Sequence, residues 1–412
     1  MRAALLIVCA LVLHVRADAD TPDLRENDAT TSRITAGIDV LNRLYWSPTL
    51  NIWIERPGDL RAHYEGRMNP PWWSSANAVE TLLDFMKVSG TADYESAITA
   101  LYELHKVPGG TATRVVAELK RLGQWSAADE EKWQRRQIAP GTGNEYYTEF
   151  RNEYLDDSGW WGIAWLKMFD RTSDGKFLTT ARAIHAHMAK NWRPDKGGGV
   201  MWAEEPDKLT PNAITNSLFL VLSARLYQRT HDAAYLKWAE QEHAWFHASA
   251  LFDGKGVVDV PGHHGDYWTY NQGAFIGGLT ALYQATDRAD YIEEAVQVAD
   301  GVLHRSGVVR PDGVIVEKLG TNGWDPGLFK GVFARYLGQL RDVLNDRKLH
   351  ADTAQEIDRS LRSSVASMIA HSLGADGQYA CEWHEGAKDQ RRNFNTQTSA
   401  LAALVSALPG SP

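Results

Sequence analysis

The sequence predicts an all-α protein whose helical hairpins close into a ring, an (α/α)6 toroid of six hairpins. Three observations support this fold class. Segments with helical hydrophobic periodicity alternate with short loops, and strand signals are few. Helices that are apolar on all sides alternate with amphipathic ones. The turn that joins such a pair recurs along the chain at nearly constant spacing.

One hairpin shows both kinds of helix in succession. Residues 212–227 are apolar almost all round, which is typical of a helix buried on both sides. Asn212 and Thr215 supply oxygens that can cap its first turn. Residues 232–245 keep apolar side chains on one side and charged ones elsewhere. We therefore expect the first helix to lie inside the ring and the second to cover it from outside.

The turn between these helices belongs to a repeat. An aromatic residue, a Thr/Asp turn and a second aromatic residue follow one another three times, with Thr172, Thr230 and Thr286 lying 58 and 56 residues apart. A weaker copy lies at residues 88–94. Repeats of two helices stack because one unit cannot bury its apolar face alone. About six such hairpins fit into the chain, and closing them into a ring removes the need for end caps.

Composition favours a single globular unit. The chain has 412 residues, of which 44% are hydrophobic, and a formal net charge of −9. An acidic chain repels phosphate backbones, so we expect no nucleic-acid partner. No Pro/Ser-rich linker divides the sequence, so residues 33–412 are expected to form one catalytic domain and a monomer. Residues 106–153 are expected to form a helix followed by a long surface excursion.

The N-terminus has the pattern of an export signal. Arg2 precedes an apolar run over residues 3–15, and Ala17-Asp18-Ala19 matches a small-x-small cleavage site. We expect a signal peptide over residues 1–19, cleaved after Ala19, a flexible tail over 20–32, and a secreted or periplasmic protein. The alternative is a buried first helix. No later stretch reaches the roughly 20 apolar residues that a spanning helix needs, so no membrane association is expected after cleavage.

Cysteine usage agrees with a mature chain that has no internal disulfide. Of the two cysteines, Cys9 lies inside the expected signal peptide and only Cys381 follows it. One cysteine cannot form an internal disulfide.

The most informative stretch for chemistry is the adjacent pair Asp156-Asp157, just before a tryptophan-rich inner helix. In a helical toroid the N-termini of the inner helices open on one face, which is the expected active-site funnel. Neighbouring carboxylates can settle about 5–6 Å apart, close to the separation that retaining glycosidases need. The alternative is that the two acids only cap the helix, which is common for aspartate.

Tryptophans add evidence for a sugar site. Sixteen are present, and several crowd near expected loop-to-helix junctions. Indole faces stack on sugar rings while the N–H group remains free for a hydroxyl. Each tryptophan taken alone could instead fill the core. The crowded ones are Trp72, Trp73, Trp160, Trp161, Trp202, Trp268 and Trp324.

Three further loops open toward inner helices: residues 197–202, rich in glycine, residues 267–273, which carry amide side chains, and residues 328–331. His263 and His264, with Asp259 and Asp266, form a local cluster that lacks a third histidine. We therefore expect no metal site and no cofactor.

With these motifs the chain resembles glycoside hydrolase family 76, the endo-acting α-1,6-mannanases. The resemblance covers residues 31–408. It is carried by five motifs in order, at residues 156–161, 198–202, 212–216, 270–273 and 329–331. It implies an (α/α)6 barrel, hydrolysis with retention, Asp156 as nucleophile and Asp157 as acid/base, with α-mannan or manno-oligosaccharide as substrate. The loop over residues 259–264 departs from the family pattern.

The motifs and the resemblance together give a set of expected substrate-binding residues. The set is Trp160, Trp161, Trp202, Asn216, Asp259, Trp268, Tyr270, Asn271, Gln272, Phe329 and Lys330.

Two other functions remain open from the sequence. An unsaturated-uronide hydrolase or a polysaccharide lyase could share the toroid, but such enzymes handle acidic sugars and should line the funnel with Arg, Lys or His. The motifs here offer Asp, Asn, Gln and Trp, which suit a neutral glycan. A non-catalytic glycan-binding protein would keep the toroid without turnover, and the intact aspartate pair argues against it.

Overall fold

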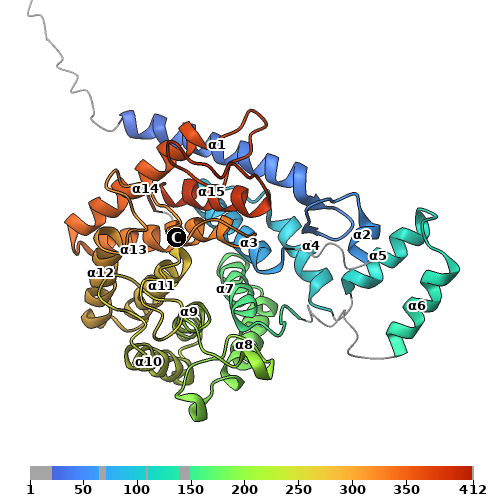
Figure 1. Ribbon diagram of the computed structural model, residues 1–412, viewed down its shortest axis with the longest axis horizontal. Coiled ribbons are helices and arrows are strands. Elements are labelled where there is room, and N and C mark those ends of the chain that lie inside the picture. Colours follow the sequence, from blue (N-terminus) through green and yellow to red (C-terminus); the bar gives the residue numbers. More distant parts are fainter. Residues whose placement is uncertain (1–20, 65–70, 108–109, 139–148, 411–412) are drawn as a thin grey trace, which may run out of the picture.

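The computed structural model describes residues 21–64, 71–107, 110–138 and 149–410. Its centre is a closed ring of six inner helices, in which each packs against the next and the last returns to the first (Figure 1). This confirms the all-α toroid that the hydrophobic patterns predict. The inner helices are α3 (Trp72–Ser89), α7 (Leu155–Thr172), α9 (Ala213–Thr230), α11 (Thr269–Thr286), α13 (Pro326–Arg347) and α15 (Phe394–Ser406).

A second layer of helices covers the ring. The helix after each of the first five inner helices runs back outside it: α4 (Glu95–His105), α8 (Gly175–Lys190), α10 (Ala233–Ala248), α12 (Ala289–His304) and α14 (Ala351–His371). The sixth hairpin is assembled differently, because α1 (Thr21–Tyr45) packs against α15. The Gln397 side-chain amide donates to the carbonyl of Gly37 across 360 positions of sequence. The first described helix therefore serves as the outer partner of the last.

Helix α1 changes one expectation from the sequence. Residues 21–32, expected to be a flexible tail, are its first turns. Ile34, Ile38 and Leu41 follow at helical spacing and are buried, so they anchor the helix and the preceding polar residues extend it. The expected signal peptide at residues 1–19 lies outside the described residues.

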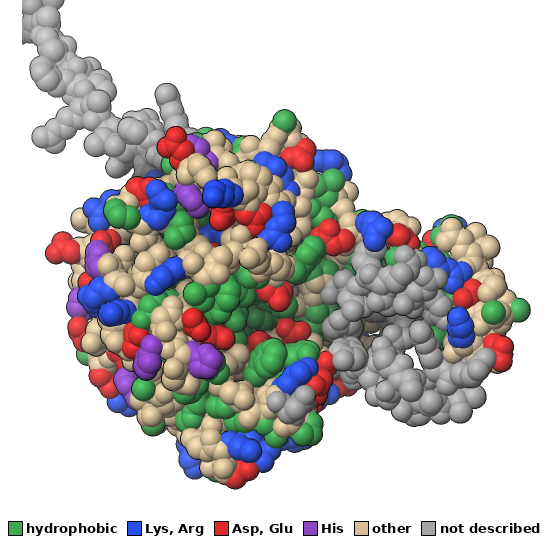
Figure 2. All heavy atoms as spheres, viewed as in Figure 1, with side chains coloured by type: hydrophobic (Ala, Val, Ile, Leu, Met, Phe, Trp, Pro, Cys, Tyr) green, Lys and Arg blue, Asp and Glu red, His purple; other side chains and the backbone are tan. Residues whose placement is uncertain are grey.

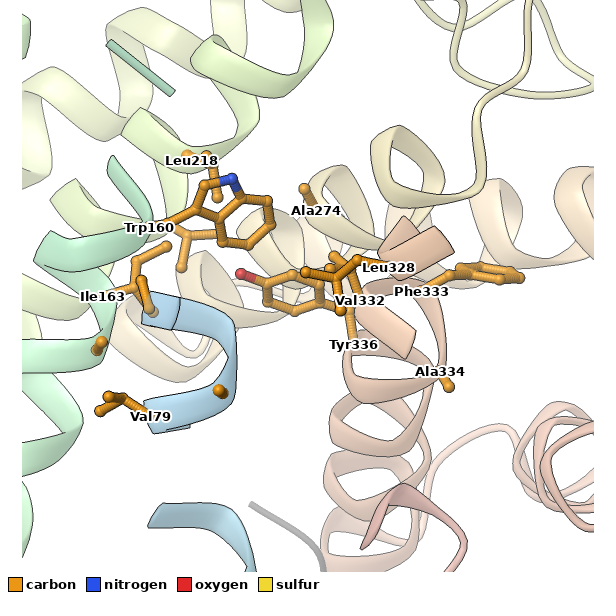
Figure 3. Packing of buried hydrophobic residues seen from close by; sticks show 14 of the residues in the cluster. Val79, Trp160, Ile163, Leu218, Ala274, Leu328, Val332, Phe333, Ala334 and Tyr336 are labelled. Atoms are coloured by element: carbon orange, nitrogen blue, oxygen red, sulfur yellow. The ribbon is translucent and has the colours of Figure 1, made fainter. Parts of the chain in front are cut away.

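The inner helices approach one another by backbone contact. A Cβ atom on Gly331 of α13 would lie 2.5 Å from the Cα of Ser399 in α15. One on Gly273 of α11 would lie 2.7 Å from the Cα of Phe333. Real side chains cannot occupy such gaps, so these glycines set the close spacing of the ring. Figure 3 shows side chains from several inner helices, among them Trp160, Leu218 and Tyr336, packed together within it.

The repeated turns share one structure. The hydroxyl of each repeat threonine donates to the carbonyl four residues earlier, at 2.8 Å in all three cases. The next residue is left-handed and ends the inner helix, as in many helix C-caps. In the weaker copy, Ser89 donates to the Phe85 carbonyl and Gly90 takes the left-handed position. The left-handed residues in the three strong copies are Ser173, His231 and Asp287.

A small lobe lies beside the ring at the right of Figure 1. It contains α2 (Leu60–Tyr64), α5 (Gly110–Arg121) and α6 (Ala127–Ile138), and Arg61 forms an ion pair with Asp129 at 3.0 Å. Residues 106–153, expected to hold one helix and a surface excursion, thus contain two helices, α5 and α6. Two short antiparallel strands, β1 (Trp46–Ser47) and β2 (Ile52–Trp53), lie next to α1.

The buried hydrophobic residues of the described chain form a cluster that extends from Ile34 to Leu408. Within the described ranges, no helix has both the length and the apolar character needed to cross a bilayer. Two single-turn 3-10 helices, Pro194–Lys196 and Pro206–Lys208, lie in the loop between α8 and α9.

Candidate active site

The N-terminal ends of five inner helices converge on one cavity of about 640 Å³. The first turn or cap of each contributes a lining residue: Trp73, Asp156, Asn212, Tyr270 and Asp325. This confirms that the chemistry-bearing loops open on one face of the ring. Figure 2 shows one face of the toroid, where hydrophobic and acidic side chains gather around a central hollow.

The carboxylate of Asp156, at the start of α7, is held in one orientation by hydrogen bonds to both of its oxygens. One of its carboxylate oxygens accepts the backbone N–H of Asp157 at 3.0 Å, and the other accepts the indole N–H of Trp202 at 3.2 Å. Burial nevertheless raises the pKa of Asp156 above its ordinary value, while these hydrogen bonds pull it down. The carboxylate is therefore desolvated yet fixed in direction, as a nucleophile requires.

Asp157 has a different environment. Its carboxylate accepts a 2.7 Å hydrogen bond from the side-chain amide of Asn152. The Asn152 side-chain oxygen is already used by the backbone N–H of Tyr154, which fixes the amide orientation. Burial, and after it the charge of Asp156, raises the pKa of Asp157 well above its ordinary value. A carboxyl group kept protonated in this way can serve as a general acid.

Two more carboxylates line the cavity. Asp325 accepts the indole N–H of Trp73 at 2.9 Å, and Asp259 accepts the side-chain amide of Asn271 at 2.9 Å. Burial raises the pKa of both carboxyl groups. The charge of Asp325 also raises the pKa of the catalytic candidates Asp156 and Asp157. The cavity therefore concentrates negative potential, which favours a reacting centre that becomes positive.

Aromatic rings form much of the wall. Tyr270 and Phe329 stack with ring centroids 3.8 Å apart, and Trp73 lies 6.0 Å from both Trp160 and Phe329. Such surfaces suit the apolar faces of sugar rings. Among the described residues that line the cavity, Lys208 is the only basic one; it donates to the hydroxyl of Tyr154 at 2.8 Å. This lining fits a neutral ligand better than an acidic sugar.

Comparison with known proteins identifies the family. The family model described as glycosyl hydrolase family 76 matches residues 127–410, more than half of the chain. The chain belongs to glycoside hydrolase family 76. It is therefore a glycoside hydrolase, and the resemblance inferred from the five motifs is confirmed.

Relatives within this family are distant. A mannan endo-1,6-alpha-mannosidase of Saccharomyces cerevisiae is 27% identical over 318 residues, covering 69% of this chain and 68% of that protein. The alpha-1,6-mannanase of a Salegentibacter species has a similar structure, with a TM-score of 0.70 at 21% identity, over 92% of this chain and 98% of that one. An inactive variant of the Salegentibacter enzyme, with two adjacent aspartates replaced by alanine, forms a complex with α-1,6-mannotetrose; its TM-score is 0.72 at 20% identity, with the same coverage. The chain spans about two thirds of the length of the yeast relatives it matches.

The structure brings seven of the expected site residues to the cavity wall. These are Asp156, Asp157, Trp160, Trp202, Asp259, Tyr270 and Phe329. The other six do not line the cavity: Trp161, Asn216, Trp268, Asn271, Gln272 and Lys330.

Two of these six, both amides, hold the backbone of the loops. Asn216 accepts the N–H of Val200 at 2.7 Å and donates to the Val200 carbonyl at 2.9 Å. Gln272 does the same to Val257, at 2.6 and 2.7 Å. Each side-chain amide bonds to both the backbone N–H and the backbone carbonyl of one loop residue. It therefore fixes a loop to the start of an inner helix and is not available to a sugar hydroxyl. The clamp at Val200 lies two residues before Trp202 and so helps to place the indole that binds Asp156.

The remaining four are supporting residues. Trp161 is buried and stacks on Trp165, with centroids 5.4 Å apart. Trp268 packs its edge against Phe329, and Asn271 holds Asp259. Lys330 is buried with its ammonium group 5.0 Å from the ring centroid of Trp383. These residues are neighbours in sequence or contacts of lining residues, and side-chain direction within a helix turn decides which residues face the cavity.

Several lining residues were absent from the expected set: Trp73, Tyr154, Lys208, Thr210, Asn212, Val260 and Asp325. A signal for Asp325 existed, because it is an acid directly before an inner helix, much as the Asp156 pair begins one. Lys208 and Thr210 come from a loop without periodicity, where no sequence rule gives the direction of a side chain. His263 lies 3.6 Å from Asp266, and both are largely exposed, so the local histidine cluster stays at the surface.

Proposed function

We propose that this chain hydrolyses internal α-1,6-mannosidic linkages of α-mannan with retention of anomeric configuration. The observation that carries the proposal is the adjacent pair Asp156-Asp157 on the wall of the aromatic cavity, with different partners for each acid. Helix capping alone does not explain the pair, because neither acid is the N-cap of α7; Tyr154 occupies that position.

The proposed reaction has two steps. A carboxylate oxygen of Asp156 attacks the anomeric carbon while the protonated Asp157 gives its proton to the departing glycosidic oxygen, so the C–O bond breaks and a mannosyl ester forms. Water then gives a proton to Asp157 and its oxygen attacks the anomeric carbon, which releases Asp156. The negative charges of Asp259 and Asp325 favour the oxocarbenium character of both transition states.

The proposed substrate follows from the cavity lining and from the relatives. A wall of aromatic rings and carboxylates suits a neutral hexose polymer. The yeast relative is a mannan endo-1,6-alpha-mannosidase, and the inactive Salegentibacter mannanase variant is bound to α-1,6-mannotetrose. Together these support α-1,6-mannan over an acidic glycan, and turnover over simple binding.

We also propose that the chain acts outside the cytoplasm as a monomer, after cleavage behind Ala19. The motif over residues 1–19 supports export. A polymer such as mannan reaches an enzyme only outside the cell membrane. N-terminal sequencing of the exported protein checks the cleavage site, and a mature chain that begins elsewhere contradicts it.

Product analysis tests the activity. Unbranched α-1,6-mannan and branched yeast mannan are digested in parallel, and products are separated at early times. We expect a ladder of short oligosaccharides from the unbranched polymer. Release of mannose alone would contradict internal cleavage, and turnover of unsaturated uronides instead would favour the alternative enzyme class.

Proton NMR of the fresh digest tests retention. Inverting enzymes usually hold their carboxyl groups about 6.5–9.5 Å apart, a separation that adjacent residues reach only with both side chains splayed. We therefore expect the α-anomer to appear first, before mutarotation. An initial β-product would show that water attacks directly and that a more distant acid replaces one member of the pair.

A further inference from the structure

On the outer layer of the toroid, three side chains direct ligand atoms at one another. His243 and His247 lie one turn apart on α10, and Glu294 lies on α12. The Nε2 atoms of the two imidazoles are 3.2 Å apart, and they lie 2.7 and 2.9 Å from the two carboxylate oxygens of Glu294. None of the three lines the cavity.

These three contacts cannot all be hydrogen bonds when the carboxylate is ionised. An ionised carboxylate only accepts, so each Nε2 must carry a proton to bond with Glu294. Two protonated Nε2 atoms then face each other at 3.2 Å and repel. If one of them gives up its proton to accept from the other, it loses its bond to the carboxylate. A metal ion removes this conflict, because every Nε2 and every oxygen can then offer a lone pair.

We propose that His243, His247 and Glu294 bind a zinc ion that joins α10 to α12. Two imidazoles and a carboxylate are a ligand set that zinc accepts, with water in the fourth position. At Zn–N distances of about 2.0–2.1 Å, tetrahedral ligands lie roughly 3.3–3.4 Å apart, close to the separation of the two Nε2 atoms. The side chain of His247 is 57% exposed, which leaves room for that water.

The surroundings hold the ligands in place. The side chains of His243 and Glu294 are 18% and 15% exposed. The ring of His243 also packs edge-on against Tyr291, one turn before Glu294 on α12. Zinc would therefore find a mostly formed site on two neighbouring outer helices. Its effect is expected on stability and not on the hydrolytic step, since Asp156 and Asp157 lie at the N-terminus of an inner helix and none of the three ligands lines the cavity.

A nearby pair supplies the matched control. His350 contacts Glu293 at 3.0 Å, linking the start of α14 to α12 by one imidazole and one carboxylate. Two ligands without a second imidazole form a much weaker site. The His350→Asn variant keeps a residue that tolerates the left-handed backbone at this position.

The experiment uses the full chain without a polyhistidine tag, stripped with EDTA and freed of the chelator. Zinc chloride is titrated by calorimetry, and Co²⁺ is substituted to give a visible spectrum. We expect one zinc per chain, a higher melting temperature with zinc, and affinity reduced at least about 100-fold by His247→Ala or Glu294→Gln. His350→Asn should bind zinc as the unmodified chain does.

Circular dichroism and the zinc-free melting temperature establish that each variant is folded. The proposal is overturned if the unmodified chain binds no zinc at micromolar concentration, or if folded His247→Ala and Glu294→Gln variants both bind it unchanged. Because the readout is metal content and needs no sugar, its failure is separate from failure of the proposed mannanase activity.

Discussion

Two groups of buried acids lie within the same ring of helices, and they differ in their partners. Two to three turns below the cavity, Glu80 and Asp84 of α3 meet Lys167 of α7 and Arg335 of α13, at 2.6 to 3.4 Å. The cavity acids Asp156 and Asp157 have hydrogen-bond donors but no ion pair among the described residues.

This difference in partners indicates that the lower group stabilises the fold and that the cavity acids take part in catalysis. Burial raises the pKa of an acid and basic partners lower it: the charges of Arg335 and Lys167 prevail at Glu80, whose pKa is lowered, whereas burial prevails at Asp84, whose pKa is raised. The cavity acids have no basic partner to oppose burial, and the pKa of each is raised, which suits proton exchange during catalysis. Local departures from charge pairing are a feature of functional sites. The comparison therefore predicts that changes in the upper group alter catalysis and that changes in the lower group alter stability.

The largest expected effect is on catalysis by the upper group. Asp156→Asn and Asp157→Asn should each lower kcat by at least about 10³-fold, roughly 4 kcal/mol in the barrier. Folding should be unchanged or slightly more stable, because each variant replaces a buried acid that has no basic partner by an uncharged amide of similar shape. Steady-state kinetics with thermal melts measure both effects. A variant that keeps more than a tenth of the original kcat would show that its acid has another role.

The next effect is on stability through the lower group. Arg335→Met leaves Glu80 and Asp84 to share Lys167 and also removes the hydrogen bonds from Arg335 to Asn77. We expect a loss of about 3 kcal/mol in the free energy of unfolding, since a buried charge loses its partner. Urea unfolding measures it. The folded fraction should keep nearly full kcat. A large fall in kcat without loss of stability would contradict the structural role assigned to this group.

A third kind of buried acid sharpens the distinction. Glu242 of α10 is fully buried, and neither of its carboxylate oxygens has a hydrogen-bond partner among the described residues. Burial raises its pKa well above the ordinary value. The unfolded chain therefore loses this proton first, and stability should fall as pH rises above about 4.3, the pKa of unfolded glutamate.

Replacing Glu242 tests this pH dependence. The Glu242→Gln variant keeps the shape of the side chain and has no proton to lose. Relative to the unmodified chain, it should gain up to about 1–3 kcal/mol of stability between pH 4 and 7, with equal kcat. Urea melts at several pH values provide the difference. A difference that does not change with pH would mean that Glu242 titrates alike in both states.

The smallest expected effect concerns metal and activity. Proton transfer and nucleophilic attack are assigned to side chains of the cavity, so EDTA should leave the initial rate of mannan hydrolysis unchanged. If the site on α10 and α12 holds zinc, EDTA should lower the melting temperature at the same time. Loss of rate that added Zn²⁺ or Ca²⁺ restores would contradict the assignment of catalysis to carboxylates alone.

The ring was predictable from the sequence for definite physical reasons. All-round apolar helices and recurring Thr turns report burial and chain reversal, and both are local properties. The pairing of α1 with α15 was not predictable in this way, because it joins residues such as Gly37 and Gln397 that share no local pattern. The expected tail over residues 20–32 is helical from Thr21 onward, and the sequence did not show this because the helix depends on an anchor further along the chain.

The sequence predicted where the site lies, but it predicted only some of the residues that line the cavity. Asp156 and Asp157 were expected just before the inner helix and instead lie in the first turn of α7, which starts at Leu155; either position brings them to the funnel. Asn216 and Gln272 lie only one or two positions further into their helices and point toward loop backbone, a difference that residue type does not encode. The spacing of His243 and His247 was visible in the sequence, but their third partner lies 47 residues beyond His247 on another helix.

Closure of the ring by α1 and α15 has a consequence for the order of synthesis. The apolar face of α1 is made before any of the inner helices, yet the helix that covers it, α15, is the last inner helix to be made. The hydroxyl of Tyr45 likewise donates a hydrogen bond to the side chain of Gln378, which is made 333 residues later. Contacts so distant in sequence form slowly, so α1 has no inner partner until all the other helices of the ring have been made. For the exported protein that we propose, this delay would help to keep the ring open during transport, because the ring cannot close before α15 has been made.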